Sequence, residues 1–241
     1  MRLLLISNST MPGEPYLDYP KHEIAGFLGR RPVTALFLPF AAVTFSYDEY
    51  ETKVEERFAE VGHHVTGIHR VADPIAAVRQ AEAIVVGGGN TWQLVRRMHE
   101  LKIMEPIREK VLAGTPFIGW SAGANVACPT LRTTNDMPIV DPLGFDTLGL
   151  LPFQINPHYL DANPEGHAGE TREQRILEFL EINPLVTVVG LREGTMLLRE
   201  NNHLTLIGNH TARIFRKGLQ AEEWPSSQDF SPLLAPEKPL A

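Results

Sequence analysis

Apolar runs of strand length alternate with longer amphipathic stretches along most of this chain, and this alternation limits the fold more than any other feature. Strands are predicted at residues 2–6, 33–38, 64–68, 83–86, 116–119 and 186–191. Helices are predicted between them, at residues 20–28, 48–61, 74–80, 92–101, 106–112 and 173–182. Strands and helices in alternation form a mostly parallel sheet with helices on both of its faces. The predicted fold class is therefore α/β.

The C-terminal part departs from this alternation. Residues 195–199 and 203–207 flank the turn sequence Glu200-Asn201-Asn202, which predicts a β-hairpin, and a last strand is predicted at residues 212–215. Prolines at 225, 232, 236 and 239 follow Trp224. We therefore expect a single α/β domain over residues 1–218 and a poorly ordered, proline-rich tail over residues 219–241.

Charge and cysteine content narrow the partners and the compartment. The 241 residues carry a formal net charge of −7 without a Lys/Arg-rich run, so the basic face that nucleic acids require is not indicated. The apolar stretch of residues 2–6 ends at Ser7 and is too short for a signal peptide or a membrane span. Cys128 is the only cysteine, which fits a reducing compartment, and we interpret it as a small buried residue. We expect a cytoplasmic monomer or homodimer that binds neither nucleic acid nor a membrane.

A serine lies between glycines where a predicted strand turns into a helix. The sequence Gly119-Trp120-Ser121-Ala122-Gly123 has the G-x-S-x-G pattern of a nucleophile elbow, in which glycines permit a strained turn that exposes the serine hydroxyl. The alternative for Ser121 is an ordinary helix N-cap. We favour the nucleophile, because a cap does not need the flanking glycines.

Three glycines, Gly87 to Gly89, follow the strand at residues 83–86. The loop lacks the Gly-Lys-Ser/Thr of a P-loop and the G-x-G-x-x-G of a dinucleotide fold. Its N–H groups suit an oxyanion hole, in which Gly88 or Gly89 acts together with Ala122. The alternative is a non-catalytic module that binds an anion or a nucleotide in this loop.

A general base and an acid to orient it are needed to activate the serine. His158 is the best candidate base, because it follows a strand predicted at residues 153–157 that ends in the rigid Pro157. Asp136 and Glu193 are both candidates for the orienting acid. Glu193 follows a predicted strand, whereas Asp136 would give the chain order serine, acid, histidine; order alone does not decide between them.

Two helix starts carry capping signals, Asn90 with Gln93 and Thr171 with Gln174. Arg172 stands at the start of the second helix, where its guanidinium could pair with an anionic ligand; the alternative is a solvated surface arginine. No metal site is predicted, because the sequence has no His-Glu-x-x-His motif and no cysteine pair, and His167 with Glu165 and Glu170 forms an isolated loop cluster.

Taken together, the motifs at residues 87–91, 119–125, 156–159 and 169–172 closely resemble those of the peptidase E family, the aspartyl dipeptidases among the serine peptidases. The resemblance runs from Met1 to about Phe215. It implies a class I glutamine amidotransferase-like, flavodoxin-like α/β fold and hydrolysis of dipeptides with an N-terminal aspartate, without a metal or other cofactor.

The resemblance also implies roles for single residues. Ser121 matches the nucleophile and His158 the base, while the third member of the triad matches either Asp136 or Glu193. Asn90 and Arg172 match positions that we assign to the substrate aspartate. Two enzymatic alternatives remain: an amidotransferase, although related folds use a cysteine nucleophile for that reaction, and a general esterase acting on uncharged acyl groups.

Overall fold

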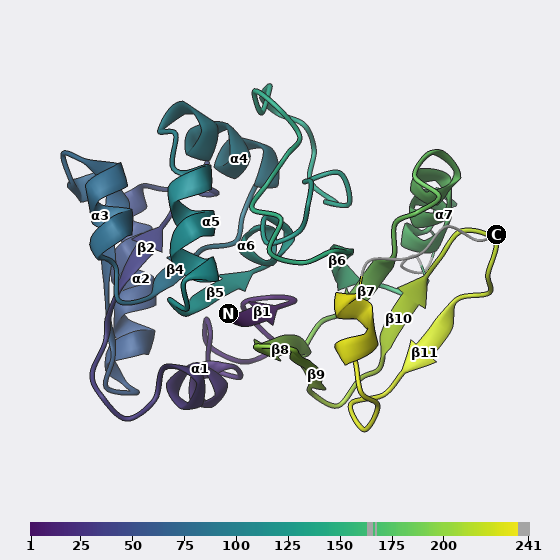
Figure 1. Cartoon of the computed structure of the whole chain (residues 1–241), viewed down its shortest axis with the longest axis horizontal. Coiled ribbons are helices and arrows are strands. Elements are labelled where there is room, and N and C mark those ends of the chain that lie inside the picture. Colours follow the sequence, from purple (N-terminus) through teal and green to yellow (C-terminus); the bar gives the residue numbers. More distant parts are fainter. Residues whose placement is uncertain (163–165, 167, 236–241) are drawn as a thin grey trace.

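The computed structural model describes residues 1–162, 166 and 168–235. Its larger sheet has seven strands in the order β3-β2-β4-β5-β1-β8-β9 (Figure 1). These strands are β1 (Arg2–Ile6), β2 (Thr34–Leu38), β3 (His64–Gly67), β4 (Ile84–Val86), β5 (Phe117–Trp120), β8 (Met196–Glu200) and β9 (His203–Ile207). The first five are parallel to one another, whereas β8 and β9 form the predicted hairpin and pair antiparallel.

Helices cover both faces of this sheet, as predicted. Alternate residues of β1 belong to different hydrophobic clusters, because successive side chains of a strand point to opposite faces. Leu3 and Leu5 share one cluster with side chains of α3, α4, α5 and α6, while Leu4 and Ile6 share the other with α1 and α2. The helices are α1 (Lys21–Leu28), α2 (Tyr47–Ala59), α3 (Pro74–Gln80), α4 (Thr91–Glu100), α5 (Met104–Leu112) and α6 (Ala122–Asn125), and a 3-10 turn, η1 (Ile68–Arg70), follows β3. The α/β fold class is confirmed.

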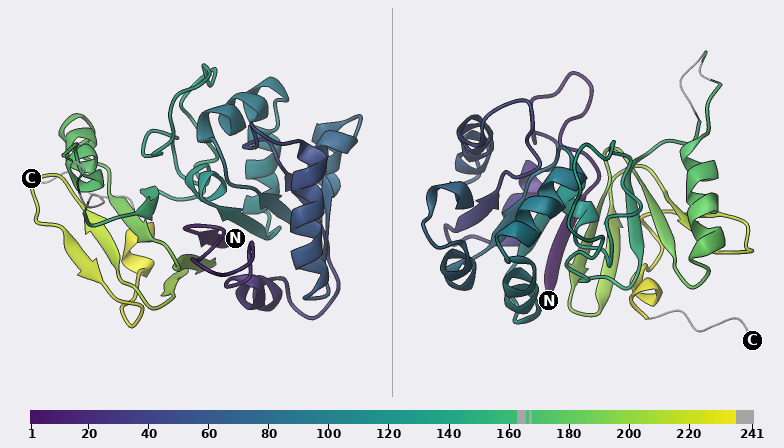
Figure 2. Two further views of the ribbon diagram at one scale, coloured as in Figure 1. Left: turned by 180° about the vertical axis from the view of Figure 1, so that it is seen from behind. Right: turned by 90° about the horizontal axis from the view of Figure 1, so that it is seen from above.

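A second sheet was not anticipated by the sequence pattern. It contains β6 (Gln154–Tyr159), β7 (Val188–Arg192), β10 (Ala212–Phe215) and β11 (Glu222–Trp224), in the order β11-β10-β7-β6. Helix α7 (Arg172–Ile182) packs Ile176 and Leu180 against one face of this sheet and lies on the far side of the molecule from α1 to α3 (Figure 2). The strands predicted near 186–191 and 212–215 therefore exist, but they extend a smaller sheet rather than the parallel one.

The segment after residue 218 packs against this second sheet, contrary to the expectation of a poorly ordered tail. Strand β11 pairs with β10, with Trp224 opposite Ala212, and a 3-10 turn, η2 (Ser231–Leu234), follows. The side chains of Trp224, Phe230 and Leu233 are buried. Burial of these apolar groups outweighs the local effect of the prolines over residues 219–235. Residues 236–241 lie outside the described part of the chain.

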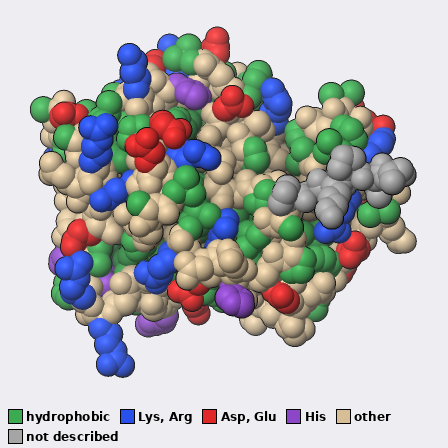
Figure 3. Space-filling model, in the orientation of Figure 1, with side chains coloured by type: hydrophobic (Ala, Val, Ile, Leu, Met, Phe, Trp, Pro, Cys, Tyr) green, Lys and Arg blue, Asp and Glu red, His purple; other side chains and the backbone are tan. Residues whose placement is uncertain are grey.

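The surface of the described residues carries charges of both signs. Figure 3 shows basic and acidic side chains interspersed over one face. Among the described helices, none is long and apolar enough to cross a bilayer.

Candidate active site

The candidate site lies where the two sheets meet. The glycine loop follows β4 and Ser121 follows β5, which are neighbours in the larger sheet, while His158 lies in β6 and Glu193 follows β7 in the smaller one. A cavity of about 280 Å³ opens at this junction. Its lining includes Ser121, Ala122, Asp136, His158, Arg172 and Glu193, whereas Gly88, Gly89 and Asn90 lie outside that lining. The volume suits a small ligand, because sites for drug-sized molecules begin at about 300 Å³.

Ser121 occupies a strained turn. Its backbone has φ 53° and ψ −112°, and its N–H donates to the carbonyl of Ile6 at 3.0 Å. A Cβ on Gly119 would lie 2.2 Å from the carbonyl oxygen of Gly123, and one on Gly123 would lie 2.1 Å from that of Val86. Both glycines are therefore needed for the turn. Ser121 stands at the N-cap position of α6, but its side chain makes no capping hydrogen bond there.

His158 is directed into the site by an irregularity in β6. The β6–β7 register shifts between Asn156 and Tyr159, and His158 has φ 52°. A β-bulge of this kind re-aims a side chain out of the regular alternation. The ring reaches across to the larger sheet, where Nε2 lies 3.0 Å from Ser121 Oγ, and its Nδ1 lies 2.6 Å from Glu193 Oε1. A hydrogen-bonded row of serine, histidine and glutamate results.

The two candidate acids have different partners. Glu193 is hydrogen-bonded to His158, whereas Asp136 is anchored at the start of α4. Its Oδ2 accepts from the N–H of Thr91 at 2.8 Å, from Thr91 Oγ1 at 2.6 Å and from Thr134 Oγ1 at 3.0 Å. Asp136 makes no hydrogen bond to His158 among the described residues, although both line the same cavity.

The glycine loop touches the nucleophile turn. A Cβ on Gly88 would lie 3.0 Å from Ser121 Cβ, so the Gly88 backbone packs directly against the serine. Gly89 has φ 135°, and a Cβ there would lie 2.3 Å from the carbonyl oxygen of Ala41. The N–H groups of Gly88 and Gly89 donate to no backbone carbonyl in the described chain. Together with the N–H of Ala122, which starts α6, they are the available donors for an oxyanion.

Arg172 is half-buried at the first position of α7, behind the capping box formed by Thr171 and Gln174. Its guanidinium lines the cavity and has no carboxylate partner within the described residues. Burial, followed by repulsion from Arg175, lowers the pKa of Arg172 from its ordinary value. The group nevertheless stays protonated, because arginine does not lose its proton in proteins. An anionic ligand would supply the missing partner.

Asn90 has structural partners for both ends of its side chain. Its Oδ1 caps α4 by accepting from the Gln93 N–H at 3.1 Å, and its Nδ2 donates to the carbonyl of Met137 at 2.9 Å. Asn90 therefore fixes the start of α4 and the loop that carries Asp136.

Comparison with known proteins identifies the family of this chain. The sequence pattern of peptidase family S51 matches residues 3–207. The chain belongs to peptidase family S51. Peptidase E of Salmonella typhimurium is 54% identical over 222 residues, covering 92% of this chain and 96% of the relative. Peptidase E of a Nostoc species is 52% identical over 223 residues, covering 92% of each chain.

Two solved structures share the fold of this S51 family member. A crystal structure of a peptidase from an acI-B1 actinobacterium aligns with TM-score 0.69 at 16% identity, covering 95% of this chain and 96% of that one. A putative peptidase E from Listeria monocytogenes aligns with TM-score 0.67 at 20% identity, covering 86% and 98%. The resemblance to the peptidase E family that the motifs indicated is thus confirmed, and the chain is a peptidase of family S51.

Two buried residues after β1 support the site and were not singled out from the sequence. Ser7 Oγ donates to the carbonyl of Leu191 at 2.7 Å and accepts from the His158 N–H at 2.9 Å. Asn8 Oδ1 accepts from the N–H of Gly194, next to Glu193, at 2.9 Å. Because β1 lies beside β5 in a parallel sheet, its carboxyl end points to the same edge. That rule, applied to β1 as well, would have found both residues.

A hydrogen-bonded cluster of aromatic side chains, Tyr50, Trp120 and Tyr16, contacts the backbone of the glycine loop. The hydroxyl of Tyr50 donates to the carbonyl of Gly88 at 2.9 Å and accepts from Trp120 Nε1 at 3.1 Å. Tyr16 joins this group, with its hydroxyl 2.9 Å from that of Tyr50. Burial raises the pKa of Tyr50 to about 12, so its hydroxyl remains a donor at neutral pH.

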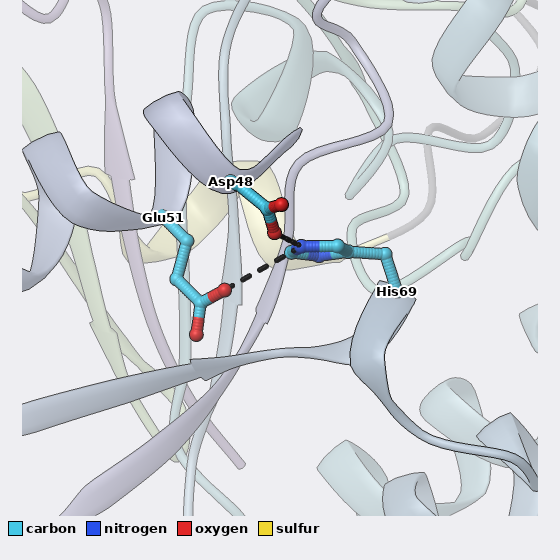
Figure 4. A group of neighbouring side chains, drawn as sticks. All are labelled: Asp48, Glu51 and His69. Carbon is cyan, nitrogen blue, oxygen red and sulfur yellow. Dashed lines mark hydrogen bonds and ion pairs between the residues drawn. The ribbon is translucent and has the colours of Figure 1, made fainter. Parts of the chain in front are cut away.

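One cluster in the described chain has the side chains of a metal site. Asp48 and Glu51 lie one turn apart on α2 and face His69 of η1 (Figure 4). Arg70 already pairs with both carboxylates, at 2.8 Å from Asp48 and 2.5 Å from Glu51, so one of their two negative charges is compensated within the protein. Among the loop residues considered for a metal, Glu165 and His167 lie outside the described residues.

Proposed function

We propose that this S51 peptidase is a serine-type dipeptidase that hydrolyses dipeptides with an N-terminal aspartate through an acyl-enzyme. The observation that carries the proposal is the hydrogen-bonded row of Ser121, His158 and Glu193 in one small cavity with Arg172, a cation that has no carboxylate partner among the described residues. The row is suited to nucleophilic acyl transfer, and the cation to an acidic acyl group.

Acylation begins when Ser121 Oγ attacks the aspartyl carbonyl carbon and His158 Nε2 takes the hydroxyl proton. Glu193 accepts a hydrogen bond from His158 Nδ1–H, which holds the tautomer in which Nε2 is the free base. The carbonyl oxygen becomes an oxyanion against the N–H groups of the glycine loop and Ala122. His158 then gives the proton to the leaving amine, and the peptide bond breaks.

Deacylation repeats these steps with water. His158 Nε2 removes a proton from water as the oxygen attacks the aspartyl ester, and the proton then passes to Ser121 Oγ when the ester bond breaks. Free aspartate is released and the serine is restored.

Selectivity for aspartate follows from the charge of Arg172. A half-buried guanidinium that no described carboxylate pairs with favours a carboxylate ligand, because the pair can form two parallel hydrogen bonds. Neutral acyl groups leave that cation unpaired, which argues against a general esterase. The serine at the elbow likewise argues against an amidotransferase with a cysteine nucleophile.

The test is hydrolysis of Asp-Leu, Asn-Leu and Ala-Leu by the purified protein and by Ser121→Ala, with the exposed Ser226→Ala as the control. We expect cleavage of Asp-Leu far above the other two, loss of activity only in Ser121→Ala, and no effect of EDTA. Asp-Leu hydrolysis that survives in Ser121→Ala would contradict the serine mechanism. Equal cleavage of all three dipeptides would contradict the role of Arg172.

A further inference from the structure

Only one carboxylate oxygen of Asp136 accepts hydrogen bonds from the described residues. Its Oδ2 accepts three hydrogen bonds from Thr91 and Thr134, while Oδ1 has no partner among the described residues. The main chain is held as well, because Trp92 Nε1 donates to the Asp136 carbonyl at 3.0 Å. The free oxygen therefore belongs to a rigidly held, negatively charged group in the wall of the cavity.

Asp136 and Arg172 share this wall without forming an ion pair. Each has unused capacity for an opposite charge, and separate elements, the start of α4 and the start of α7, hold them in place. A cavity with a fixed anion and a fixed cation fits a ligand with a complementary ammonium and carboxylate. An N-terminal aspartyl residue has its α-ammonium and its side-chain carboxylate on adjacent carbons.

We propose that Asp136 Oδ1 binds the α-ammonium of the substrate, opposite the carboxylate held by Arg172, and that the enzyme therefore requires a free N-terminus. This inference rests on the proposed function and assigns Asp136 to substrate selection instead of the triad. It selects peptides whose first residue is aspartate with an unmodified amino group, and it disfavours N-acylated or internal aspartate.

Glu193 is the competing carboxylate in the same cavity, and its chemistry makes it the poorer ammonium partner. Its Oε1 lies 2.6 Å from His158 Nδ1, and the imidazole becomes cationic during acylation. A substrate ammonium on Glu193 would compete with that imidazolium. With Asp136 as the second carboxylate, the imidazolium of His158 pairs with Glu193 and the substrate ammonium pairs with Asp136.

The test compares two chromogenic substrates, aspartyl p-nitroanilide and succinyl p-nitroanilide. The succinyl group has the same carbon chain and side carboxylate as aspartyl but has no amino group. We expect wild-type kcat/KM to favour the aspartyl substrate by about 100-fold, the order of a lost hydrogen-bonded charge contact. That preference should fall as pH rises through about 8, where a peptide α-amino group loses its proton.

Asp136→Asn keeps the side-chain size, and its single oxygen can replace Oδ2 as the acceptor for Thr91. Its NH₂ then faces the cavity and repels an ammonium. We expect kcat/KM for the aspartyl substrate to fall by about 100-fold while the succinyl substrate is little affected. Asp141→Asn, an exposed aspartate in the same loop, is the control for loss of one charge.

Equal losses on both substrates would overturn the inference, because they would assign Asp136 to the triad or to the fold of α4. No loss on either would also overturn it, because the ammonium would then lie elsewhere. Competitive inhibition by L-aspartate and by succinate gives a second readout: wild type should bind aspartate more tightly, and Asp136→Asn should not. If folded wild type cleaves neither substrate nor Asp-Leu, the proposed function fails and this inference fails with it.

Discussion

Replacing Glu193 by glutamine tests which acid orients the histidine. The carboxylate and ring lie 2.6 Å apart, and their side chains are 40% and 36% exposed. Opposite charges about 4 Å apart attract by about 1 kcal/mol in water and by about 4 kcal/mol near a protein surface, so a half-exposed pair is worth about 2–3 kcal/mol. Each 1.36 kcal/mol changes a rate about tenfold, which predicts a loss of about 30- to 150-fold in kcat.

The glutamine adds a second effect. Its NH₂ can donate to His158 Nδ1, which leaves the proton on Nε2, where it prevents the ring from taking the Ser121 proton. Loss of the correct tautomer in a serine triad lowers kcat by about 10⁴-fold, so we expect a total loss of about 10²- to 10⁴-fold.

The assay is steady-state hydrolysis of aspartyl p-nitroanilide, with thermal unfolding to show that the variant is folded. KM should change little, because the mechanism gives Glu193 no contact with the substrate. Glu178→Gln, an exposed glutamate on α7, is the control for loss of one charge. A folded Glu193→Gln enzyme with less than a tenfold loss in kcat would refute the role of Glu193.

Three further predictions concern buried side chains. Tyr50→Phe removes the hydroxyl that donates to the Gly88 carbonyl and so positions the glycine loop. Steady-state kinetics should show a fall in kcat of about tenfold with KM little changed, because an oxyanion donor of this loop is then less well placed. An unchanged kcat would contradict that role. Ser7→Ala leaves the His158 N–H without its acceptor, so urea unfolding should show a loss of about 1–3 kcal/mol together with a lower kcat; stability and kcat equal to wild type would count against it. Burial raises the pKa of the Cys128 thiol to about 12, so the thiol stays protonated at pH 8. Mass spectrometry should therefore show iodoacetamide labelling of Cys128 only after unfolding, and rapid labelling of the folded enzyme would contradict this.

The elements of the fold could be predicted because periodicity reports which face of an element is buried. Helix α3 (Pro74–Gln80) and strand β10 (Ala212–Phe215) have the predicted bounds, and the hairpin of β8 and β9 was also expected. The sheet that each strand joins was not predictable, because an apolar run of residues does not specify which strand it will pair with. The chain between α6 and β6 leads away from the larger sheet, so β7 pairs with β6 and not with β1.

The site could be predicted as far as sequence position determines it. Ser121 was predicted as the nucleophile because it follows a strand of the parallel sheet. His158 was predicted as the base because a strand and Pro157 precede it, whereas its place at a bulge in the smaller sheet was not predicted. Both roles stay predictions. The choice between Asp136 and Glu193 depends on side-chain hydrogen bonds made by Thr91 and Thr134, which no local pattern encodes. The expected substrate contact of Asn90 stays a prediction. The side chain of Asn90 already makes a helix cap and a loop contact.

Hydrogen bonds within the protein hold the strained backbone of the site. Ser121 and His158 both have positive φ, at 53° and 52°, and each such residue costs roughly 1–3 kcal/mol. They belong to different sheets, yet buried hydrogen bonds inside the protein hold them: Ser7 fixes His158, and the Ile6 carbonyl fixes Ser121. Because no ligand is needed to maintain this geometry, the attraction of Asp136 and Arg172 for a zwitterionic aspartyl group does not have to organise the triad. That binding energy remains available to hold the scissile carbonyl against Ser121, where it accelerates acylation.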